Sequence, residues 1–317
     1  MHLPDGFLDA KTAVVAGGLA IGGVAWAVRG VRHTLPAQRM PLLGTAAAFV
    51  FAAQMLNFPV VGGTSGHLLG ATLAAVLLGP FASVIVMTCV LVLQCFLFQD
   101  GGLTALGANV LNMALVATGV ASVVLSVLRR VLGDGLRARL LATAFAAWCS
   151  TVAASVCCAG ELAASGTVAW HAALPAMAGV HMIIGLGEAL VTTLVVASVS
   201  RLRPELVEPG PAPSAGRAPG ALVGQGLMVA VGLAVFVAPF ACGWPDGLER
   251  VAASLGFEHV ARAPLLAAPW PDYAVPGLGA TPLATVLAGV LGTCLAFAFA
   301  WFLARRLAPP TSPRDAA

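Results

Sequence analysis

The stretch FASVIVMTCVLVLQCFLF occupies residues 81–98 and contains no charged side chain. An α-helix needs about 20 apolar residues to cross the roughly 30 Å of hydrocarbon in a bilayer, so this run predicts a membrane-spanning helix. Comparable runs recur along the whole chain, at 11–28, 41–57, 67–79, 81–98, 108–128, 138–160, 171–200, 221–241 and 283–304. They predict an all-α polytopic membrane protein, a seven-helix bundle plus two further transmembrane helices. The third run is short, and we expect it to be buried or tilted among its neighbours.

The composition agrees with this class of fold. Hydrophobic residues make up 59% of the 317 residues and charged residues only 9%, whereas about a quarter of a soluble domain is charged. The apolar runs are continuous and do not alternate, which excludes a membrane β-barrel. The net charge of +3 comes from arginines clustered between the apolar runs, with no aromatic residues interleaved. Nothing in this pattern indicates a nucleic-acid partner.

The arginines also predict the orientation, because cytoplasmic loops of membrane proteins retain an excess of Lys and Arg. With the amino terminus outside, alternate loops on one side hold thirteen of the sixteen cationic residues. These are Arg29, Arg32, Arg39, Arg129, Arg130, Arg137, Arg139, Arg201, Arg203, Arg217, Arg305, Arg306 and Arg314. We therefore expect a multi-pass protein of the cell (inner) membrane, with its amino terminus outside and its carboxyl terminus cytoplasmic.

A change in composition divides the chain. The stretch RLRPELVEPGPAPSAGRAPG, residues 201–220, is rich in proline and glycine and has no apolar period, which is typical of a linker. It predicts a seven-helix module at 1–200, a cytoplasmic linker at 201–220 and a two-helix module at 221–317. The second module carries a long outer loop.

The chain begins MHLPDGFL, and this start offers three nitrogen donors. The α-amine of Met1, the amide nitrogen of His2 and the imidazole Nδ1 of His2 can close two fused chelate rings on one cation. Planar nitrogen sites suit nickel(II), copper(II) and cobalt, whereas magnesium and calcium prefer oxygen. His2 is bulky, so we expect Met1 to be retained. The alternative is an accidental histidine at a terminus that frays.

A fourth donor follows in NFPVVGGTSGHLLG, residues 57–70, on the same outer side. Its glycines permit irregular backbone, and such backbone at membrane depth is tolerated where it lines a cavity. His67 ends this loop and could face His2. The alternative is a histidine that only makes a hydrogen bond at a helix start.

The same loop contains GTSG, residues 63–66, which resembles the nucleophile motif of rhomboid intramembrane proteases. An intramembrane serine protease with Ser65 as nucleophile and His181 as base is therefore an alternative function.

An acid also lies deep in a predicted span, seven residues after His181 on one helical face. This residue, Glu188, either supports a metal-ligating imidazole or makes a structural hydrogen bond between helices, and we favour the structural role. An ionisable residue within a membrane is a functional candidate by default. Four residues are candidates to support the metal ligands without binding the metal themselves: Ser65, Asn109, His181 and Glu188.

A P-loop requires a lysine after its second glycine, and the sole lysine, Lys11, follows Ala10. The chain therefore does not hydrolyse ATP by that route, and we expect it not to be an enzyme. It is a passive binder, an autonomous ion-coupled carrier or a subunit driven by partners.

Four stretches resemble a known family. MHLPDGFL, FVFAAQMLNFPVVGGTSGHLLG, LFQDGGLTALGANVLNM and HMIIGLGEAL are similar to the substrate-binding subunits of energy-coupling-factor transporters for nickel and cobalt, the NikM/CbiM group. The resemblance implies a seven-helix protein whose amino terminus inserts into the bundle. Met1 and His2 would supply amine, amide and imidazole nitrogens there, and His67 would complete the set.

The second module resembles the small NikN-type component through PDGLE, residues 245–249, and PLLAAPWPDYAVPGL, residues 264–278. Its outer loop is expected to help load the metal, and this fusion favours nickel over cobalt. The resemblance implies a transmembrane coupling (T) subunit and two cytoplasmic ATPase subunits as partners, and a role in metal supply such as cobalamin biosynthesis. We expect no resident cofactor; Ni²⁺ or Co²⁺ is the transported ligand.

Overall fold

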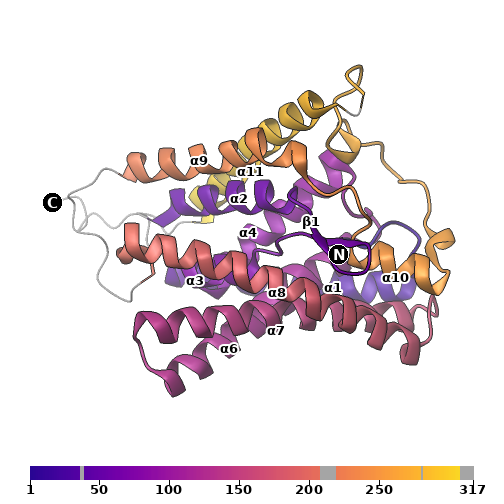
Figure 1. Cartoon of the computed structure of the whole chain (residues 1–317), viewed down its shortest axis with the longest axis horizontal. Coiled ribbons are helices and arrows are strands. Elements are labelled where there is room, and N and C mark those ends of the chain that lie inside the picture. Colours follow the sequence, from indigo (N-terminus) through magenta and orange to yellow (C-terminus); the bar gives the residue numbers. More distant parts are fainter. Residues whose placement is uncertain (36–38, 208–218, 280, 308–317) are drawn as a thin grey trace.

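The computed structural model describes residues 1–35, 39–207, 219–279 and 281–307. Its long helices lie side by side along the long axis of the molecule (Figure 1). Within the described residues, seven helical segments are long and apolar enough to cross a membrane, namely Ala10–Thr34, Pro80–Phe98, Leu106–Leu132, Leu136–Ala164, Trp170–Leu202, Gly220–Phe240 and Pro282–Leu307. Large apolar side chains on them are exposed, as lipid-facing residues must be. The chain is a multi-pass α-helical membrane protein.

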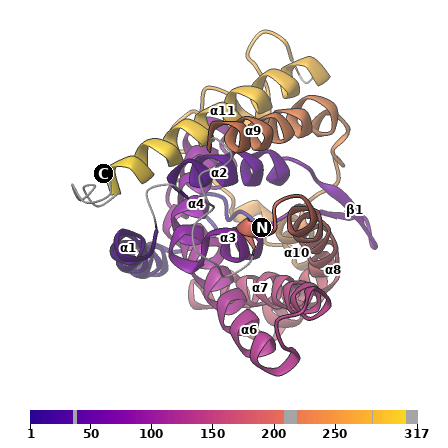
Figure 2. The same cartoon turned by 90° about the vertical axis from the view of Figure 1, so that its left-hand side faces the viewer.

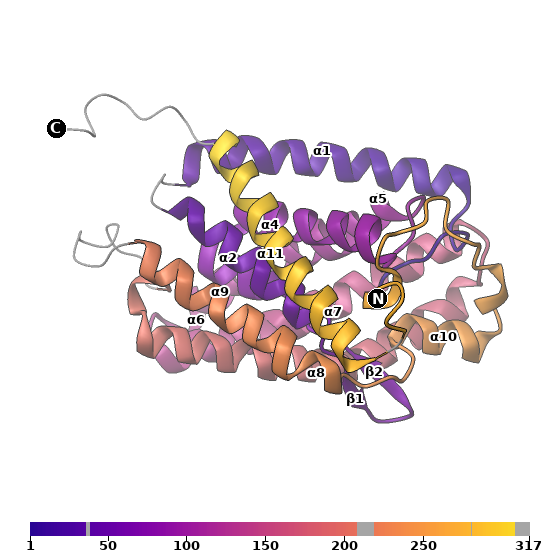
Figure 3. The same ribbon diagram turned by 90° about the horizontal axis from the view of Figure 1, so that it is seen from above.

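The helices form two outer layers with shorter helices between them (Figures 1 and 2). One layer contains α2 (Met40–Gln54), α9 (Pro219–Phe236) and α11 (Pro282–Leu307), and the opposite layer contains α6 (Ala117–Leu132), α7 (Leu136–Ala164) and α8 (Trp170–Leu202). Between them lie α3 (Ala71–Leu78) and α4 (Pro80–Leu93). The first helix, α1 (Ala10–Thr34), packs at the edge against α4 and α5 (Leu106–Asn109) (Figures 2 and 3).

Two of the nine predicted spans are shorter than a full crossing. Helix α2 has 15 residues and α3 has only 8. The helical part of the predicted run 67–79 begins only at Ala71. Gly70, directly before it, has a left-handed backbone with φ of 85°, which does not fit an α-helix. Residues 71–75 are buried, as expected for a short helix enclosed by its neighbours.

The loop before α3 is more regular than the sequence predicts. Strand β1 (Phe58–Val60) pairs with β2 (Thr64–Gly66) as an antiparallel hairpin in which Phe58 faces Gly66. Its turn contains Gly62 and Gly63 with φ of 92° and 74°, a left-handed backbone that glycine adopts without steric cost. His67 directly follows β2, so the hairpin fixes its position.

The predicted linker 201–220 is too long at both ends. Helix α8 continues to Leu202, and a 3₁₀ turn follows at Pro204–Leu206. Val207 is buried in a cluster with Leu73 and Val196, since its apolar side chain would otherwise meet water. Helix α9 already begins at Pro219. The remainder of the predicted linker, residues 208–218, lies outside the described residues.

The long outer loop of the second module also contains structure. Asp246 caps the amphipathic helix α10 (Gly247–Leu255), and Glu249 completes a reciprocal capping box. This arrangement pairs backbone N–H groups that have no partner within the helix. Short 3₁₀ turns follow at Glu258–Val260 and Pro271–Tyr273. Helix α10 contacts α8 and β2, so this loop lies against the first module (Figure 3).

Candidate metal centre

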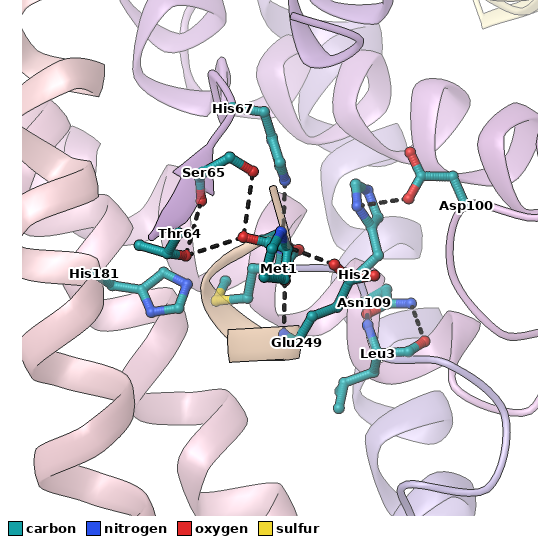
Figure 4. Close-up of polar contacts among 12 residues, drawn as sticks. Met1, His2, Leu3, Thr64, Ser65, His67, Asp100, Asn109, His181 and Glu249 are labelled. Carbon is teal, nitrogen blue, oxygen red and sulfur yellow. Dashed lines mark hydrogen bonds and ion pairs between the residues drawn. The ribbon is translucent and has the colours of Figure 1, made fainter. Parts of the chain in front are cut away.

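Residues 1–9 enter the bundle ahead of α1 without forming a helix or strand, and the chain turns at Asp5 and Gly6 (Figures 1 and 4). Met1, Leu3 and Phe7 are buried, with exposed fractions of 7%, 0% and 4%. The side chain of Asp5 is also buried, and its Oδ1 accepts hydrogen bonds from the amide and the hydroxyl of Thr104 at 2.7 and 2.6 Å. These contacts exclude a terminus that frays.

Asn109, on α5, holds this segment by its backbone. Its Oδ1 accepts a hydrogen bond from the Leu3 amide at 2.8 Å, and its Nδ2 donates to the Leu3 carbonyl at 3.1 Å. The amide of Gly102 donates to the same carbonyl at 2.8 Å. Both backbone groups of Leu3 are thus paired inside the protein, where unpaired groups are costly. Asn109 therefore sets the depth at which Met1 and His2 lie.

The amine of Met1 meets one imidazole and one carboxylate. It donates to His67 Nε2 at 2.9 Å and to Asp246 Oδ2 at 2.7 Å. The Nδ1 of His67 lies 3.1 Å from the Leu68 carbonyl, which can only accept, so the proton of a neutral ring is on Nδ1. Burial, together with the nearby ammonium and His2, lowers the pKa of His67 to about 3. The ring is therefore neutral near pH 7, with a lone pair on Nε2 beside the amine.

The imidazole of His2 lies against that of His67. The ring centroids are 5.3 Å apart and the planes differ by 22°. The Nδ1 of His2 is 3.0 Å from Asp100 Oδ1, while its Nε2 is buried without a hydrogen-bond partner. Chelation through Nδ1, as the sequence predicts, therefore requires the ring to turn away from Asp100.

The two carboxylates keep their negative charge. For Asp246, burial opposes ionisation, but the ammonium of Met1 outweighs it and holds the pKa below its usual range. For Asp100, burial is likewise outweighed by His2 and by the hydroxyl of Tyr273. The centre thus combines an amine, two imidazoles and two carboxylates at one end of the bundle.

The second module reaches this centre through the PDGLE sequence. The carbonyl of Pro245 accepts hydrogen bonds from the amide of Ser65 at 2.8 Å and from the hydroxyl of Thr64 at 3.1 Å. The next residue, Asp246, binds the amine and also caps α10. Leu248 is 1% exposed. Each of these contacts ties the start of α10 to β2 and to the amino terminus (Figure 4).

Gly247 fits closely against α8, and Gly247→Ala is expected to destabilise the protein. A Cβ atom at this position would lie 2.7 Å from Ile184 Cδ1 and 2.9 Å from His181 Cε1. Overpacking of this kind costs about 1–3 kcal/mol. The unfolding temperature of the full chain measures the effect. Gly243→Ala is the matched control, since its Cβ would meet no atom within 4 Å; equal stability of the two variants would contradict this packing.

The remaining predicted partners have separate roles. Ser65 donates its hydroxyl to the Trp244 carbonyl at 2.8 Å, and His181 uses Nδ1 to donate to the Met177 carbonyl at 2.8 Å. Among the hydrogen bonds of the described residues none joins Ser65 to His181, so they do not form a nucleophile and base. A cavity of about 20 Å³ separates His181 from Met1, His67 and Asp246, which is room for about one water-sized particle.

Glu188 supports the loop that carries His67. Its carboxylate accepts hydrogen bonds from the amides of Leu69 at 2.5 Å and Gly70 at 3.0 Å. These two amides lie directly before α3, and backbone N–H groups at the start of a helix have no partner within the helix. Glu188 therefore holds backbone two residues after His67 and makes no contact with the imidazole that the structure records.

Sequence reasoning missed the two acids of the centre. Asp246 carries a signal of its own, because Asp followed three residues later by Glu predicts a capping box, but its contact with the amine has no signal in the sequence. No group of three or more His, Cys, Asp or Glu side chains within the described part of the chain is placed to hold a metal ion. A metal centre here consequently depends on the terminal amine.

These features define the class of protein: a multi-pass membrane protein with a small centre of nitrogen donors and carboxylates at one end of its helical bundle. Residues 2–206 match the family described as the cobalt uptake substrate-specific transmembrane region, CbiM, and residues 220–308 match the PDGLE domain. The chain belongs to the CbiM family and carries a PDGLE domain after it.

Relatives of full length share both parts. The chain is 37% identical over 309 residues to a putative fused nickel transport protein NikMN of Archaeoglobus fulgidus, covering 96% of this chain and 98% of the relative. It is 34% identical to the fused nickel transport protein NikMN of Rhodobacter capsulatus, covering 93% and 94%. A crystal structure of a truncated transition metal transporter matches with a TM-score of 0.57 at 33% identity, over 63% of this chain and 99% of that one.

Proposed function

We propose that this chain is the metal-binding membrane subunit of an energy-coupling-factor importer of nickel or cobalt, with Met1, His2 and His67 as ligands. The observation that carries the proposal is the buried amine of Met1, 2.9 Å from Nε2 of His67, whose ring stacks on the imidazole of His2. Its family and its relatives, which are named as transport proteins, support a transporter and not an enzyme.

The donor set explains the choice of ion. Amine, amide and imidazole nitrogens favour nickel(II), copper(II) and cobalt over magnesium and calcium. Two relatives that match more than nine-tenths of this chain are named nickel transport proteins. A relative named for cobalt, of Pelobacter propionicus, matches only 41% of it. These names support nickel as the transported ion.

Loading exchanges protons for the metal. The amine binds a cation only after losing a proton, so the ion pair between Met1 and Asp246 opens as the metal enters. The carboxylate of Asp246 then faces a divalent cation in place of an ammonium, which leaves no uncompensated negative charge. Protonation of the same nitrogens assists release on the other side of the membrane.

In this proposal the energy for uptake comes from partner proteins. The chain has one lysine, Lys11, and no P-loop around it. The proposal therefore includes a transmembrane coupling (T) subunit and two cytoplasmic ATPase subunits. The amino terminus lies outside in this scheme and the carboxyl terminus in the cytoplasm. The arginines in the last turns of α1, α6, α8 and α11 support this orientation.

Titration of the purified full-length chain tests the proposal. We expect one Ni²⁺ or Co²⁺ per chain, with nickel preferred in competition, and no displacement by millimolar Mg²⁺. The measurement is a competition titration with a coloured chelator. Uptake by vesicles should require the ATPase and coupling subunits together with ATP. Uptake by vesicles that contain only this chain would instead establish an autonomous carrier.

A further inference from the structure

We propose that Glu188 is a positioning residue of the metal centre, and that it orients the imidazole of His67 through a single peptide group. That peptide group joins Leu68 to Leu69. Glu188 thereby does more than support the start of α3, although it acts on the ligand through the backbone and not by direct contact. This inference rests on the proposed function, because it assumes that His67 binds the transported metal through Nε2.

The two contacts lie at opposite ends of one peptide group. Its carbonyl, that of Leu68, lies 3.1 Å from Nδ1 of His67. Its N–H, that of Leu69, donates to Glu188 Oε2 at 2.5 Å. Because a peptide group is planar and rigid, a side chain that fixes the N–H also fixes the direction of the carbonyl. Glu188 therefore determines where the Nδ1–H group of His67 finds its acceptor.

These contacts fit a centre that holds a metal. The carbonyl meets Nδ1, whereas Nε2, which would bind the metal, is the ring nitrogen 2.9 Å from the amine of Met1. The ring of His67 consequently need not turn when the metal enters. A hydrogen bond from the second nitrogen of a ligating histidine to a carbonyl fixes both the tautomer and the orientation of the ring. The same contacts serve the empty and the loaded centre.

The next peptide group is held from two helices. The amide of Gly70 donates to Glu188 Oε1 at 3.0 Å, so each oxygen of this carboxyl group, on α8, has its own N–H partner. On the other side, Nε2 of Gln54, the last residue of α2, donates to the Leu69 carbonyl at 2.7 Å. Glu188 and Gln54 are 0% and 3% exposed. Water does not compete for these hydrogen bonds, so the backbone after His67 has one position.

The backbone before His67 is fixed by the same helix. A Cβ atom at Gly66 would lie 2.7 Å from Ile184 Cγ2, so this glycine allows β2 to approach α8 closely. Ile184 and Glu188 are four residues apart and therefore lie on one face of α8. One face of this helix thus holds the chain on both sides of the ligand.

Capping of α3 does not by itself require Glu188. A helix start is capped most simply by a Ser, Thr, Asp or Asn side chain of its own segment, and here Gly70 occupies that position without a side-chain cap. An ionisable side chain within a membrane is costly and is a functional candidate by default. The direct hydrogen bond from Leu69 gives this costly group a second task at the ligand.

Glu188→Gln tests the proposal, because it keeps the size of the side chain and replaces one of its two acceptor oxygens by an NH₂ donor. We expect nickel affinity to fall about 10-fold, at the lower end of the effect of losing a group that orients a metal ligand. The d–d absorption band of the nickel-loaded protein should also shift, because the ring of His67 is no longer held in one plane.

Ser83→Ala is the matched control. The buried hydroxyl of Ser83 donates to the Ala71 carbonyl at 2.9 Å, so it holds the same short helix but not the peptide group beside His67. We expect unchanged affinity and an unchanged band in this variant. In a His67→Ala background, Glu188→Gln should have no further effect on nickel affinity, because it acts through that ring. Wild-type affinity in Glu188→Gln, an equal loss in both backgrounds, or an equal loss in Ser83→Ala would overturn the proposal.

A second measurement uses the wild-type chain and does not depend on the folding of any variant. A metal on Nε2 makes the Nδ1–H group of His67 a stronger donor, and hydrogen bonds in series strengthen one another. The amide proton resonance of Leu69 should therefore move to lower field when Ni²⁺ is added and stay in place with Mg²⁺. The amide of Gly70 is the internal reference, since its peptide group does not contact the ring, and it should move less.

A Leu69 resonance unmoved by saturating nickel, or equal movement of both amides, would count against the proposal. If the wild-type chain binds no nickel, the proposed function fails and this inference with it. If the wild type binds nickel and Glu188→Gln binds it equally well, only this inference fails.

Discussion

Blocking the amine of Met1 is expected to abolish tight nickel binding. Removing a residue that only hydrogen-bonds to a metal ligand lowers metal affinity by up to roughly 100-fold, and we expect the loss of the amine, a direct ligand, to exceed that. A leader sequence ahead of Met1 converts the amine into an amide, whose nitrogen has no free lone pair to donate to the metal. The amine lies 2.9 Å from His67 and 2.7 Å from Asp246, and Met1 is 7% exposed. A preceding residue has no space there.

The matched control is the same polypeptide after cleavage. A leader that ends in a protease site cutting directly before Met1 gives the blocked and the free terminus from one preparation. Nickel affinity, measured by chelator competition before and after cleavage, should rise to the value of the untagged protein. Circular dichroism confirms that both forms are folded. Equal affinity before and after cleavage would remove the amine from the ligand set.

His67→Ala is expected to have the second largest effect, a loss of about 100-fold or more in nickel affinity. Removing a direct ligand lowers metal affinity more than removing a residue that only hydrogen-bonds to a ligand. Burial keeps this imidazole neutral, with its pKa lowered to about 3, so it offers a lone pair throughout the physiological pH range. The loss should therefore not depend on pH between about 6 and 8, where the ring of His67 has no charge to lose.

His259→Ala controls for the general loss of a histidine. His259 is exposed in the outer loop of the second module, and we expect its removal to leave the titration unchanged. His67→Ala should retain the helical content of the wild type, because Glu188 still holds the amides of Leu69 and Gly70. A nickel titration of His67→Ala that matches the wild type would contradict the assignment of this ligand.

Several parts of this molecule can be predicted from its sequence because their causes are local. Long apolar runs have no stable solvent other than lipid, so the membrane class follows from composition. Met1 and His2 are covalent neighbours, so their nitrogen donors can reach one cation once the His2 ring is turned towards it. The beginning of α3 and the two strands of the hairpin are less predictable, since they depend on Gly70 and on pairing across the turn.

The amino acid sequence by itself determined a helical membrane protein with nitrogen donors at its first two residues. Only the tertiary structure decided that Asp246 meets the amine and that Tyr273 holds Asp100. Both contacts join the PDGLE module to the first module across more than half of the chain. No pattern of residues encodes such contacts, because they arise when separate helices pack and bring distant loops to one end of the bundle.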